Sequence, residues 1–264
     1  MTYIPLLALN FAVAASLFVV LWLFNLRTRD PSFIDSVWAL GMVLIAWVGF
    51  AAAPNPDPHA LWLLALCTIW GLRLGLYLLW RWRKHGPDRR YKTMMALAQS
   101  ERGWGYARAS LLLVFALQAP LQWIVCLPVQ LGRFGAAAPL GPLAWAGVVL
   151  AAVGIAFETM GDAQLVRFKA DPANAGQVLQ TGLWRYTRHP NYFGDACTWW
   201  GLYLIAAETG LGAWALPGPV LLTFLLTRWS GVPTVEGRMR RKKPDYEAYV
   251  ARTSGFIPMW PKRG

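Results

Sequence analysis

Long runs of apolar residues, separated by polar connections, dominate the sequence. A helix needs about 20 predominantly apolar residues to cross a bilayer, and in lipid a helix satisfies its own backbone polar groups within one segment. The runs therefore predict an all-α integral membrane protein with seven transmembrane helices, at about residues 3–25, 33–53, 60–80, 109–131, 140–160, 193–208 and 212–229. The sixth run is short for a full span, and Pro217 and Pro219 interrupt the seventh.

The basic residues are distributed unevenly among the connections of this predicted bundle. Of the 25 Lys and Arg residues, all but two fall in the first, third and fifth connections or in the C-terminal tail. The exceptions are Arg133, in the fourth connection, and Arg73, inside the third run. Because positively charged connections remain in the cytoplasm, the pattern predicts an N-terminus outside and a cytoplasmic C-terminus. An even number of helices would break this alternation, which favours seven.

The composition is typical of a membrane protein. The chain has 264 residues, of which 56% are hydrophobic and 14% charged, whereas a soluble domain has about 25% charged residues. The net charge of +12 does not indicate nucleic acid, because the basic residues flank apolar runs. We expect no nucleic-acid partner and a multi-pass protein of the bacterial inner membrane. The three Cys and three His residues are too dispersed for a disulfide framework or a metal site.

One polar segment stands out among the apolar runs. Just before the sixth run, residues 183–195 contain Arg185, Tyr186, Arg188, His189, Asn191, Tyr192 and Asp195. The two arginines can hold a phosphate or carboxylate, and Pro190 in the first turn of a helix leaves N–H groups available to an anion. Polar groups at a membrane boundary are costly and indicate a functional site. The alternative is a positively charged flank that anchors the next helix.

A few ionisable residues lie within the predicted helices. Arg73 falls in the middle of the third run, where a lone charge needs a buried partner such as Asp35 or Glu158. Glu158 and Asp162 are four residues apart and therefore lie on one helix face. Asp35 opens the second run, where it either caps the helix or takes part in function.

Two further basic segments contribute candidate residues. The connection Lys84–Tyr91 is basic and turn-forming, which favours an ordinary cytoplasmic loop. The tail contains Arg228, Glu236 and then a basic run, which favours a patch facing lipid headgroups or solvent. We expect the cytoplasmic ends of the last three helices to form a cationic, aromatic-rich pocket for a phosphate-bearing nucleotide. Because no GxGxxG motif follows a strand, a Rossmann domain is excluded as the binder.

The segment Gln180–Asp195 resembles the C-terminal region of steroid 5α-reductases and related sterol reductases, and the segments Gly161–Leu165 and Tyr246–Pro258 extend the similarity. The resemblance implies a seven-helix membrane enzyme that binds NADPH in a pocket open to the cytoplasm. It also implies reduction of a carbon–carbon double bond conjugated to a carbonyl group. The expected cofactor-binding residues are Asp162, Lys169, Arg185, Tyr186, Arg188, His189, Asn191, Tyr192, Asp195, Arg228 and Glu236.

Four of these residues match particular family positions. Asp162, Asn191 and Asp195 match positions that contact the cofactor, and Arg228 matches an arginine on the phosphate side. Lys169 stands where the family commonly has arginine, a change that keeps the charge but loses the fork geometry.

The sequence departs from the steroid enzymes where the substrate is activated. Those enzymes polarise the substrate carbonyl with a Gln–Glu pair in the second helix and a Tyr in the third. Here the Gln–Glu pair aligns with Asp35–Ser36. The tyrosine position falls near Trp70, and Tyr77 lies further along the same predicted helix. We therefore expect Asp35 and Tyr77 to be catalytic and to hydrogen-bond the carbonyl oxygen of a lipophilic enone. Trp38 and Trp70 are expected to contact this substrate, which would come from membrane lipid through an apolar lateral cavity lined by the first four helices.

We expect one transmembrane domain over residues 1–264, with substrate-side helices in about 1–131 and cofactor-binding helices and tail in about 140–264. Two other functions stay open. Isoprenylcysteine and phospholipid methyltransferases share an Arg-His-Pro-x-Tyr-x-Gly core and a glutamate-bearing tail, here Glu236, and bind S-adenosylmethionine in a similar place. A non-catalytic lipid-binding membrane protein would bind neither cofactor. The sequence leaves open the oligomeric state and the choice between NADPH and NADH.

Overall fold

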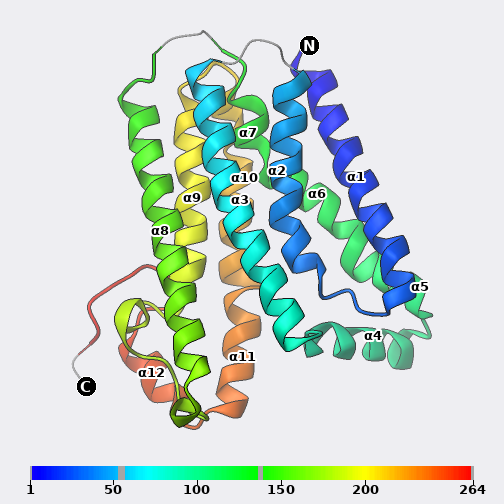
Figure 1. The fold of residues 1–264 in the computed structure, drawn as a ribbon, viewed down its shortest axis with the longest axis vertical. Coiled ribbons are helices and arrows are strands. Elements are labelled where there is room, and N and C mark those ends of the chain that lie inside the picture. Colours follow the sequence, from blue (N-terminus) through cyan, green and yellow to red (C-terminus); the bar gives the residue numbers. More distant parts are fainter. Residues whose placement is uncertain (1, 53–56, 136–138, 263–264) are drawn as a thin grey trace.

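The structure, a computed structural model, describes residues 2–52, 57–135 and 139–262 (Figure 1). Within these ranges the regular elements are helices: α1 (Tyr3–Thr28), α2 (Ile34–Ala52), α3 (Pro58–His85), α4 (Arg89–Arg102), α5 (Tyr106–Ser110), α6 (Ala116–Val125), α7 (Leu127–Leu131), α8 (Pro142–Ala170), α9 (Pro190–Ala207), α10 (Pro217–Phe224), α11 (Val232–Lys242) and α12 (Tyr246–Arg252). Two π-helical segments, η1 (Leu111–Phe115) and η5 (Leu225–Trp229), continue α5 into α6 and extend α10. Short 3₁₀ turns are η2 (Pro172–Asn174), η3 (Gly182–Arg185) and η4 (Gly212–Ala215).

Within the described residues, five helices are long and apolar enough to cross a membrane. They are α1, α2, α3, α8 and the composite helix Tyr106–Val125, which comprises α5, η1 and α6. Large apolar side chains on them, such as Val20 and Val149, are 62% and 60% exposed, where a soluble protein would carry polar groups. The prediction of an all-helical, multi-pass membrane protein is confirmed. The α9 and α10–η5 helices correspond to the sixth and seventh predicted spans but are not among the five, so seven spans stays a prediction.

The α9 helix lies inside the bundle and packs against α3, α7, α8 and α10 (Figure 1). Its contact with α8 is the closest, because a Cβ atom on Gly194 would lie 2.5 Å from the backbone oxygen of Gly154 and 2.5 Å from the backbone nitrogen of Glu158. A side chain larger than hydrogen would force the two backbones apart. The contact places the polar residues of α8 beside those at the beginning of α9.

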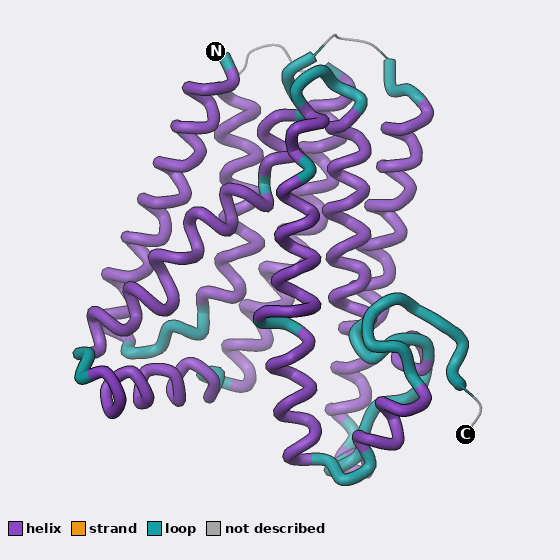
Figure 2. The backbone as a smooth tube through the Cα atoms, turned by 180° about the vertical axis from the view of Figure 1, so that it is seen from behind, coloured by secondary structure: helices purple, strands orange, loops and turns teal. Residues whose placement is uncertain are grey.

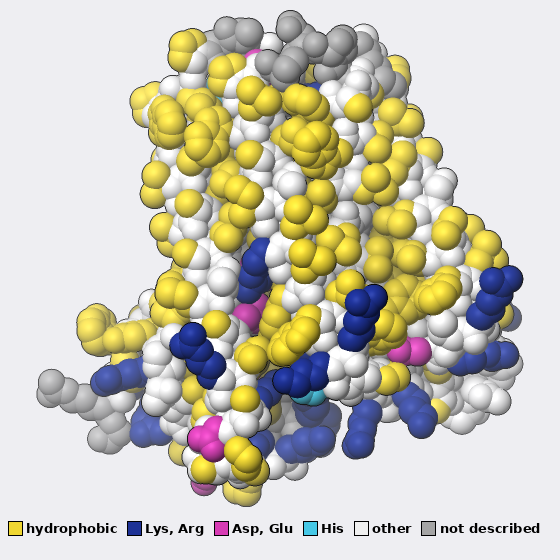
Figure 3. Space-filling view, in the orientation of Figure 1, with side chains coloured by type: hydrophobic (Ala, Val, Ile, Leu, Met, Phe, Trp, Pro, Cys, Tyr) yellow, Lys and Arg dark blue, Asp and Glu magenta, His cyan; other side chains and the backbone are white. Residues whose placement is uncertain are grey.

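The basic residues gather at one end of the bundle. Figure 3 shows Lys and Arg side chains concentrated toward the end that carries α4, α11 and α12, whereas the opposite part of this face is largely apolar. The α4 helix lies across the bundle at that end, and the C-terminal tail folds against the loop before α9 (Figures 1 and 2). Backbone hydrogen bonds from Arg188 to Ser254 and from Met259 to Tyr186 hold the tail there. The predicted topology also has one basic end, and its location in the cytoplasm stays a prediction.

Candidate active site

Two adjoining cavities lie between the helices at the basic end. The first, which we call the inner cavity, has a volume of about 450 Å³ and is lined from α2, α3, α4, α6, α8, α9 and the two π-helical segments. The second, which we call the vestibule, has a volume of about 440 Å³ and is lined mainly from α3, α4, α8 and α11. They share the lining residues Asp35, Leu78, Arg81, Arg90, Tyr192 and Thr234. The two cavities therefore form one site with a deep part and an outer part.

A single guanidinium group pairs with two acidic side chains beside the inner cavity. Arg73 of α3 pairs with two residues of α8, Glu158 at 2.9 Å and Asp162 at 2.5 Å. Asn191 of α9 donates from Nδ2 to Asp162 Oδ1 at 3.3 Å. The prediction of a buried partner for Arg73 is confirmed for Glu158. Asp35, the alternative partner, is instead bound by Arg90 and Tyr91 of α4.

Several buried polar atoms of the inner cavity have no hydrogen-bond partner among the described residues. These atoms are Glu158 Oε2, Asp195 Oδ1 and Trp38 Nε1, and all three residues line the cavity. An unpaired buried polar group costs about 1–3 kcal/mol, so such groups are normally satisfied by a ligand or by ordered water. They give the inner cavity two hydrogen-bond acceptors and one donor for a polar molecule.

A carboxylate–tyrosine pair forms another wall of the inner cavity. The Tyr91 hydroxyl donates to Asp35 Oδ1 at 2.6 Å, and Arg90 donates from Nη2 to Asp35 Oδ2 at 3.2 Å. Burial and the Asp35 carboxylate raise the pKa of the Tyr91 hydroxyl well above its ordinary value, because loss of the proton would place a second negative charge there. Tyr91 therefore remains a hydrogen-bond donor throughout the physiological pH range.

Arg90 and Tyr91 were not among the predicted site residues, since the pattern of Lys84–Tyr91 favours an ordinary loop. In the structure Asp88 accepts from the backbone N–H of Arg90 at 2.9 Å and caps α4. The helix therefore begins at Arg89, and its first turn lies against the cavity. An Asp before a helix-forming segment is a capping signal, and it was the available indication that this segment is ordered.

The vestibule is lined by cations from four helices. They are Arg81 and His85 of α3, Arg89 of α4, Lys169 of α8, and Arg238 and Lys242 of α11, with His85 cationic only when protonated. Among the described lining residues the carboxylates are Asp35 and Asp88, and both pair with Arg90. The wall of the vestibule is therefore strongly positive, which suits a phosphate-bearing ligand.

Many residues predicted for catalysis and binding meet at this site. The inner cavity is lined by Asp35, Trp38, Tyr77, Asp162, Asn191, Tyr192 and Asp195, and the vestibule by Lys169. The Tyr77 ring lies near two guanidinium groups, with its centroid 5.6 Å from Arg73 and 5.9 Å from Arg81. Residues from both predicted halves of the domain thus contribute to one site.

The other predicted residues line neither cavity: Arg185, Tyr186, Arg188, His189, Arg228, Glu236 and Trp70. Arg185 and Arg228 are exposed on the surface. Trp70 is fully buried against Trp199, with ring centroids 5.2 Å apart in an edge-to-face arrangement. Trp70 therefore belongs to the hydrophobic core, where apolar volume rather than substrate contact accounts for it.

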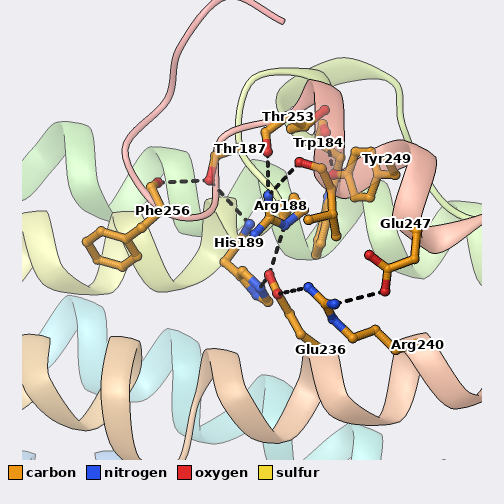
Figure 4. A network of polar contacts seen from close by, with 11 residues as sticks. Trp184, Thr187, Arg188, His189, Glu236, Arg240, Glu247, Tyr249, Thr253 and Phe256 are labelled. Atoms are coloured by element: carbon orange, nitrogen blue, oxygen red, sulfur yellow. Dashed lines mark hydrogen bonds and ion pairs between the residues drawn. The ribbon is translucent and has the colours of Figure 1, made fainter. Parts of the chain in front are cut away.

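Arg188, His189 and Glu236 form a separate cluster, which we call the tail anchor (Figure 4). Glu236 Oε1 accepts from Arg188 Nε at 2.8 Å and lies 3.1 Å from His189 Nε2. The Arg188 guanidinium also donates to the backbone oxygens of Val250 and Thr253. Since its Nε and Nη1 donors are used within the protein, Arg188 holds the C-terminal tail against the beginning of α9, and it lines neither cavity.

The tail anchor still borders the site through one aromatic contact. The His189 ring stacks on Tyr192, with centroids 5.3 Å apart and planes at 4°, and Tyr192 lines both cavities. Burial alone would raise the pKa of Glu236, but hydrogen bonds from His189 and Arg188 outweigh burial and lower this pKa to about 2. Glu236 is therefore a carboxylate at physiological pH and fixes His189, which in turn positions Tyr192.

Comparisons with known proteins give a family but no activity. Residues 21–253 match a family described as "Protein of unknown function (DUF1295)". A protein of Schizosaccharomyces pombe described as "Uncharacterized protein C594.04c" is 22% identical over 271 residues, which cover 90% of this chain and 76% of that protein. No solved structure matches the chain significantly. The functional argument therefore depends on the site itself.

The Glu236→Gln variant tests the tail anchor. Loss of the charged acceptor should lower the free energy of unfolding at pH 7 by about 1.5–3 kcal/mol, the range for hydrogen bonds to charged groups. Because the pKa of Glu236 is lowered from 4.5 to about 2 in the folded protein, its stabilisation is fully present above about pH 4.5 and is lost as the pH falls toward 2. Thermal unfolding in detergent should show a difference from wild type that shrinks over this range.

Glu247→Gln is the matched control, because the Glu247 side chain is 60% exposed and pairs only with Arg240 among the described residues, at 2.8 Å. An exposed ion pair contributes little, so this variant should unfold close to wild type. Equal loss of stability in the two variants at pH 7 would contradict a specific anchoring role for Glu236.

Proposed function

We propose that this chain, which belongs to the family described as "Protein of unknown function (DUF1295)", is a membrane-embedded NADPH-dependent reductase. Its substrate is a lipophilic enone, of which a 3-oxo-Δ4-steroid is one example, and hydride is transferred to the conjugated carbon–carbon double bond. The observation that carries the proposal is the continuity between a cationic vestibule and a deeper cavity with a carboxylate–tyrosine pair. The resemblance of residues 180–195 to steroid 5α-reductases supports the same reaction type.

The vestibule has the charge that a dinucleotide requires. Its volume of about 440 Å³ lies within the range of about 300–1,000 Å³ that is common for ligand sites. Arginine binds phosphate in fork geometry, and lysine binds it as a point charge. Arg81, Lys169 and Arg238 are the cations that we assign to the phosphates. The additional 2′-phosphate that distinguishes NADPH from NADH suits the excess of positive charge.

The inner cavity has groups that fit the nicotinamide riboside part of the cofactor. Asp195 Oδ1 and Glu158 Oε2 are buried acceptors without a partner among the described residues, so they are available to ribose hydroxyls and to the carboxamide N–H groups. Asn191 and Asp162 hold each other in place at the same wall. When bound, NADPH supplies the hydride, and the residues of the chain supply its position.

Tyr91 is the group that we assign to substrate activation. Its hydroxyl donates to Asp35 in this structure and would transfer that hydrogen bond to the carbonyl oxygen of the enone. Such a donor would stabilise the negative charge that develops on the oxygen when NADPH supplies hydride to the β-carbon, and a proton from water would then add at the α-carbon. Asp35, held by Arg90, thus positions the Tyr91 hydroxyl before the substrate binds, in place of the direct electrophilic role expected from the sequence. Tyr77 lines the same cavity and is the second candidate donor.

A methyltransferase is the alternative, and one observation favours it. The inner cavity contains the carboxylates Asp35, Glu158, Asp162 and Asp195, which are suited to the positively charged sulfonium of S-adenosylmethionine. That cofactor has no phosphate, however, so the vestibule cations would be left without an anionic ligand. A non-catalytic lipid-binding protein would leave both the cations and the unpaired acceptors unexplained. Complementarity to phosphate therefore favours the reductase.

Ligand-dependent thermal stability separates these functions. Purified protein in detergent should be stabilised by NADPH, less by NADH, and not by S-adenosylmethionine. A ligand at 100 times its Kd stabilises the native state by about 2.7 kcal/mol, which thermal unfolding readily detects. Stabilisation by S-adenosylmethionine alone would overturn the reductase, and stabilisation by none of the three would favour a non-catalytic protein.

A pair of arginine variants then locates the nucleotide. Arg238→Gln removes a vestibule cation and should weaken NADPH binding by about 10- to 150-fold, because a charge-assisted hydrogen bond contributes about 1.5–3 kcal/mol. Arg185→Gln removes an exposed arginine that lines neither cavity and should leave binding nearly unchanged. Equal weakening by the two variants would mean that overall charge, and not the vestibule, governs binding.

The Tyr91→Phe variant tests the assignment of the hydrogen-bond donor. It should lower the turnover number by about 10²–10⁴-fold, the usual contribution of a positioned acid, and leave NADPH binding nearly unchanged. The measurement is enone-dependent oxidation of NADPH, followed by absorbance, with a lipophilic enone that the wild-type protein reduces. Tyr77→Phe is the matched comparison and should have a smaller effect. If Tyr91→Phe retained full turnover while Tyr77→Phe lost it, Tyr77 would be the donor.

A further inference from the structure

A second group of cations lies at the corner of the basic end where α1, α4 and α5 meet (Figure 1). Arg29 follows α1, Arg102 is the last residue of α4, and Arg108 lies in α5. None of the three lines the inner cavity or the vestibule. We call these three arginines, together with the rings of Trp104 and Tyr106, the corner cluster. It is separate from the cations that we assign to the nucleotide.

Aromatic rings hold the three guanidinium groups of the corner cluster. Arg102 and Arg108 both lie over the Trp104 ring, with their Cζ atoms 5.0 and 4.9 Å from its centroid. Arg29 lies over the Tyr106 ring at 4.7 Å. A guanidinium group that stacks by its flat face keeps the N–H donors at its edge available to a planar or tetrahedral anion. The rings therefore orient the arginines as anion-binding groups.

The backbone of Arg29 supports a function for its side chain. Among the described residues, Arg29 is the one residue other than glycine with a positive φ, at 56°. Helices that end in this left-handed conformation usually have glycine there, because a side chain costs energy. Asn25 accepts from the Arg29 N–H at 2.9 Å and from the Tyr106 hydroxyl at 2.8 Å. One residue thus fixes both the strained backbone and the ring under the guanidinium group, an arrangement typical of a binding site.

The positive charge of the corner cluster is not neutralised within the protein. In the described part of the chain, no ion pair joins any of its three arginines to a carboxylate. The carboxylates next to them in the sequence are Asp30 and Glu101. Asp30 accepts instead from Ser32 and from Trp82 Nε1, at 2.9 Å each, and Glu101 is exposed. The cluster therefore suits an anion such as phosphate.

Exposed apolar side chains lie beside the cluster on two membrane-crossing helices. Leu112 lies about one turn beyond Arg108 in the composite helix, and it is 46% exposed. Leu23 and Phe24 lie in the last two turns of α1 and are 51% and 53% exposed. Figure 3 shows basic side chains at this corner next to a largely apolar surface. A molecule whose phosphate lies on the cluster thus has lipid-facing side chains beside its remaining part.

We propose that the corner cluster binds the headgroup of an anionic phospholipid from the leaflet at the basic end of the bundle. The phosphate accepts from the guanidinium edges of Arg102 and Arg108, with Arg29 as a third cation, and the acyl chains lie along α1 and the composite helix. Because no carboxylate is paired with the cluster, it offers no partner to the ammonium group of a zwitterionic lipid. Basic groups at a membrane surface attract anionic lipids. The proposal does not depend on the reductase function.

Native mass spectrometry of the protein in detergent tests this site without nucleotide or substrate. The protein is titrated with dioleoyl phosphatidylglycerol, with dioleoyl phosphatidylcholine, or with inorganic phosphate. We expect phosphatidylglycerol to bind at least about tenfold more tightly than phosphatidylcholine, since the second lipid has the same phosphate and chains but no net charge. Equal affinity for the two lipids, or displacement of phosphatidylglycerol by an equal concentration of inorganic phosphate, would overturn the proposal.

A charge-matched pair of double variants locates the lipid. Arg102→Gln combined with Arg108→Gln should weaken the tightest binding of phosphatidylglycerol about 30-fold, the effect of two basic residues near a membrane surface. Arg185→Gln combined with Arg241→Gln removes the same charge from exposed positions that line neither cavity, and binding should stay nearly unchanged. Equal weakening by the two double variants would mean that overall charge governs binding, which would overturn the corner cluster as the site.

Trp104→Leu separates a built site from charge alone, because it keeps every arginine. Loss of two cation–π contacts should weaken binding of phosphatidylglycerol by about 5- to 30-fold. Trp104→Phe keeps a ring and should retain most of the affinity, which controls for a general loss of folding. Unchanged affinity in Trp104→Leu would contradict the role of the rings.

NADPH binding should be unaffected by Arg102→Gln combined with Arg108→Gln, since neither residue lines a cavity. Selective binding of phosphatidylglycerol by a protein that does not bind NADPH would preserve the lipid site and remove the reductase. NADPH binding without that selectivity would preserve the reductase and remove the lipid site.

Discussion

The site depends on one guanidinium group that is placed among carboxylates inside a membrane-spanning helix. A charge at this depth is costly and persists only when it is paired. Arg73 pairs with Glu158 and Asp162, which fixes α3 against α8. The close backbone contact between α8 and α9 then brings Asn191 and Asp195 to the same place. Removing Arg73 alone would leave the buried side chains of Glu158 and Asp162 without their paired positive charge. Both the polar wall of the inner cavity and the packing of the three helices therefore depend on Arg73.

The surroundings of this ion-pair network change in character from the membrane to the aqueous side. Toward lipid, η1 and η5 provide apolar walls. At the centre, the Tyr91 hydroxyl donates a hydrogen bond to Asp35. Burial raises the pKa of this hydroxyl, so it stays protonated and remains a donor. Toward the basic end, α3, α8 and α11 provide cations. The site therefore combines apolar, hydrogen-bonding and cationic surfaces.

The apolar runs and the distribution of basic residues were sufficient to predict a helical membrane protein with one basic end, because helix length and charge are local properties. The polar residues at span boundaries, Asp162, Asn191 and Asp195, could also be found, since they are costly there. The anchoring role of Arg188 could not be predicted. Its guanidinium donates to backbone oxygens of the C-terminal tail, and no local sequence pattern indicates that the tail folds back against α9. Tyr91 was missed for a similar reason: its contact with Asp35 depends on how α4 lies against α2, and residue spacing does not report that.

The most direct test of the central claim is an experimental structure of the protein determined with NADPH in a lipid environment. The account predicts that the phosphate groups contact Arg81, Lys169 and Arg238 in the vestibule, and that the nicotinamide ring lies in the inner cavity near Asp195. A nucleotide bound elsewhere on the protein, or phosphates that contact Arg185 or Arg228 while the vestibule stays empty, would contradict it.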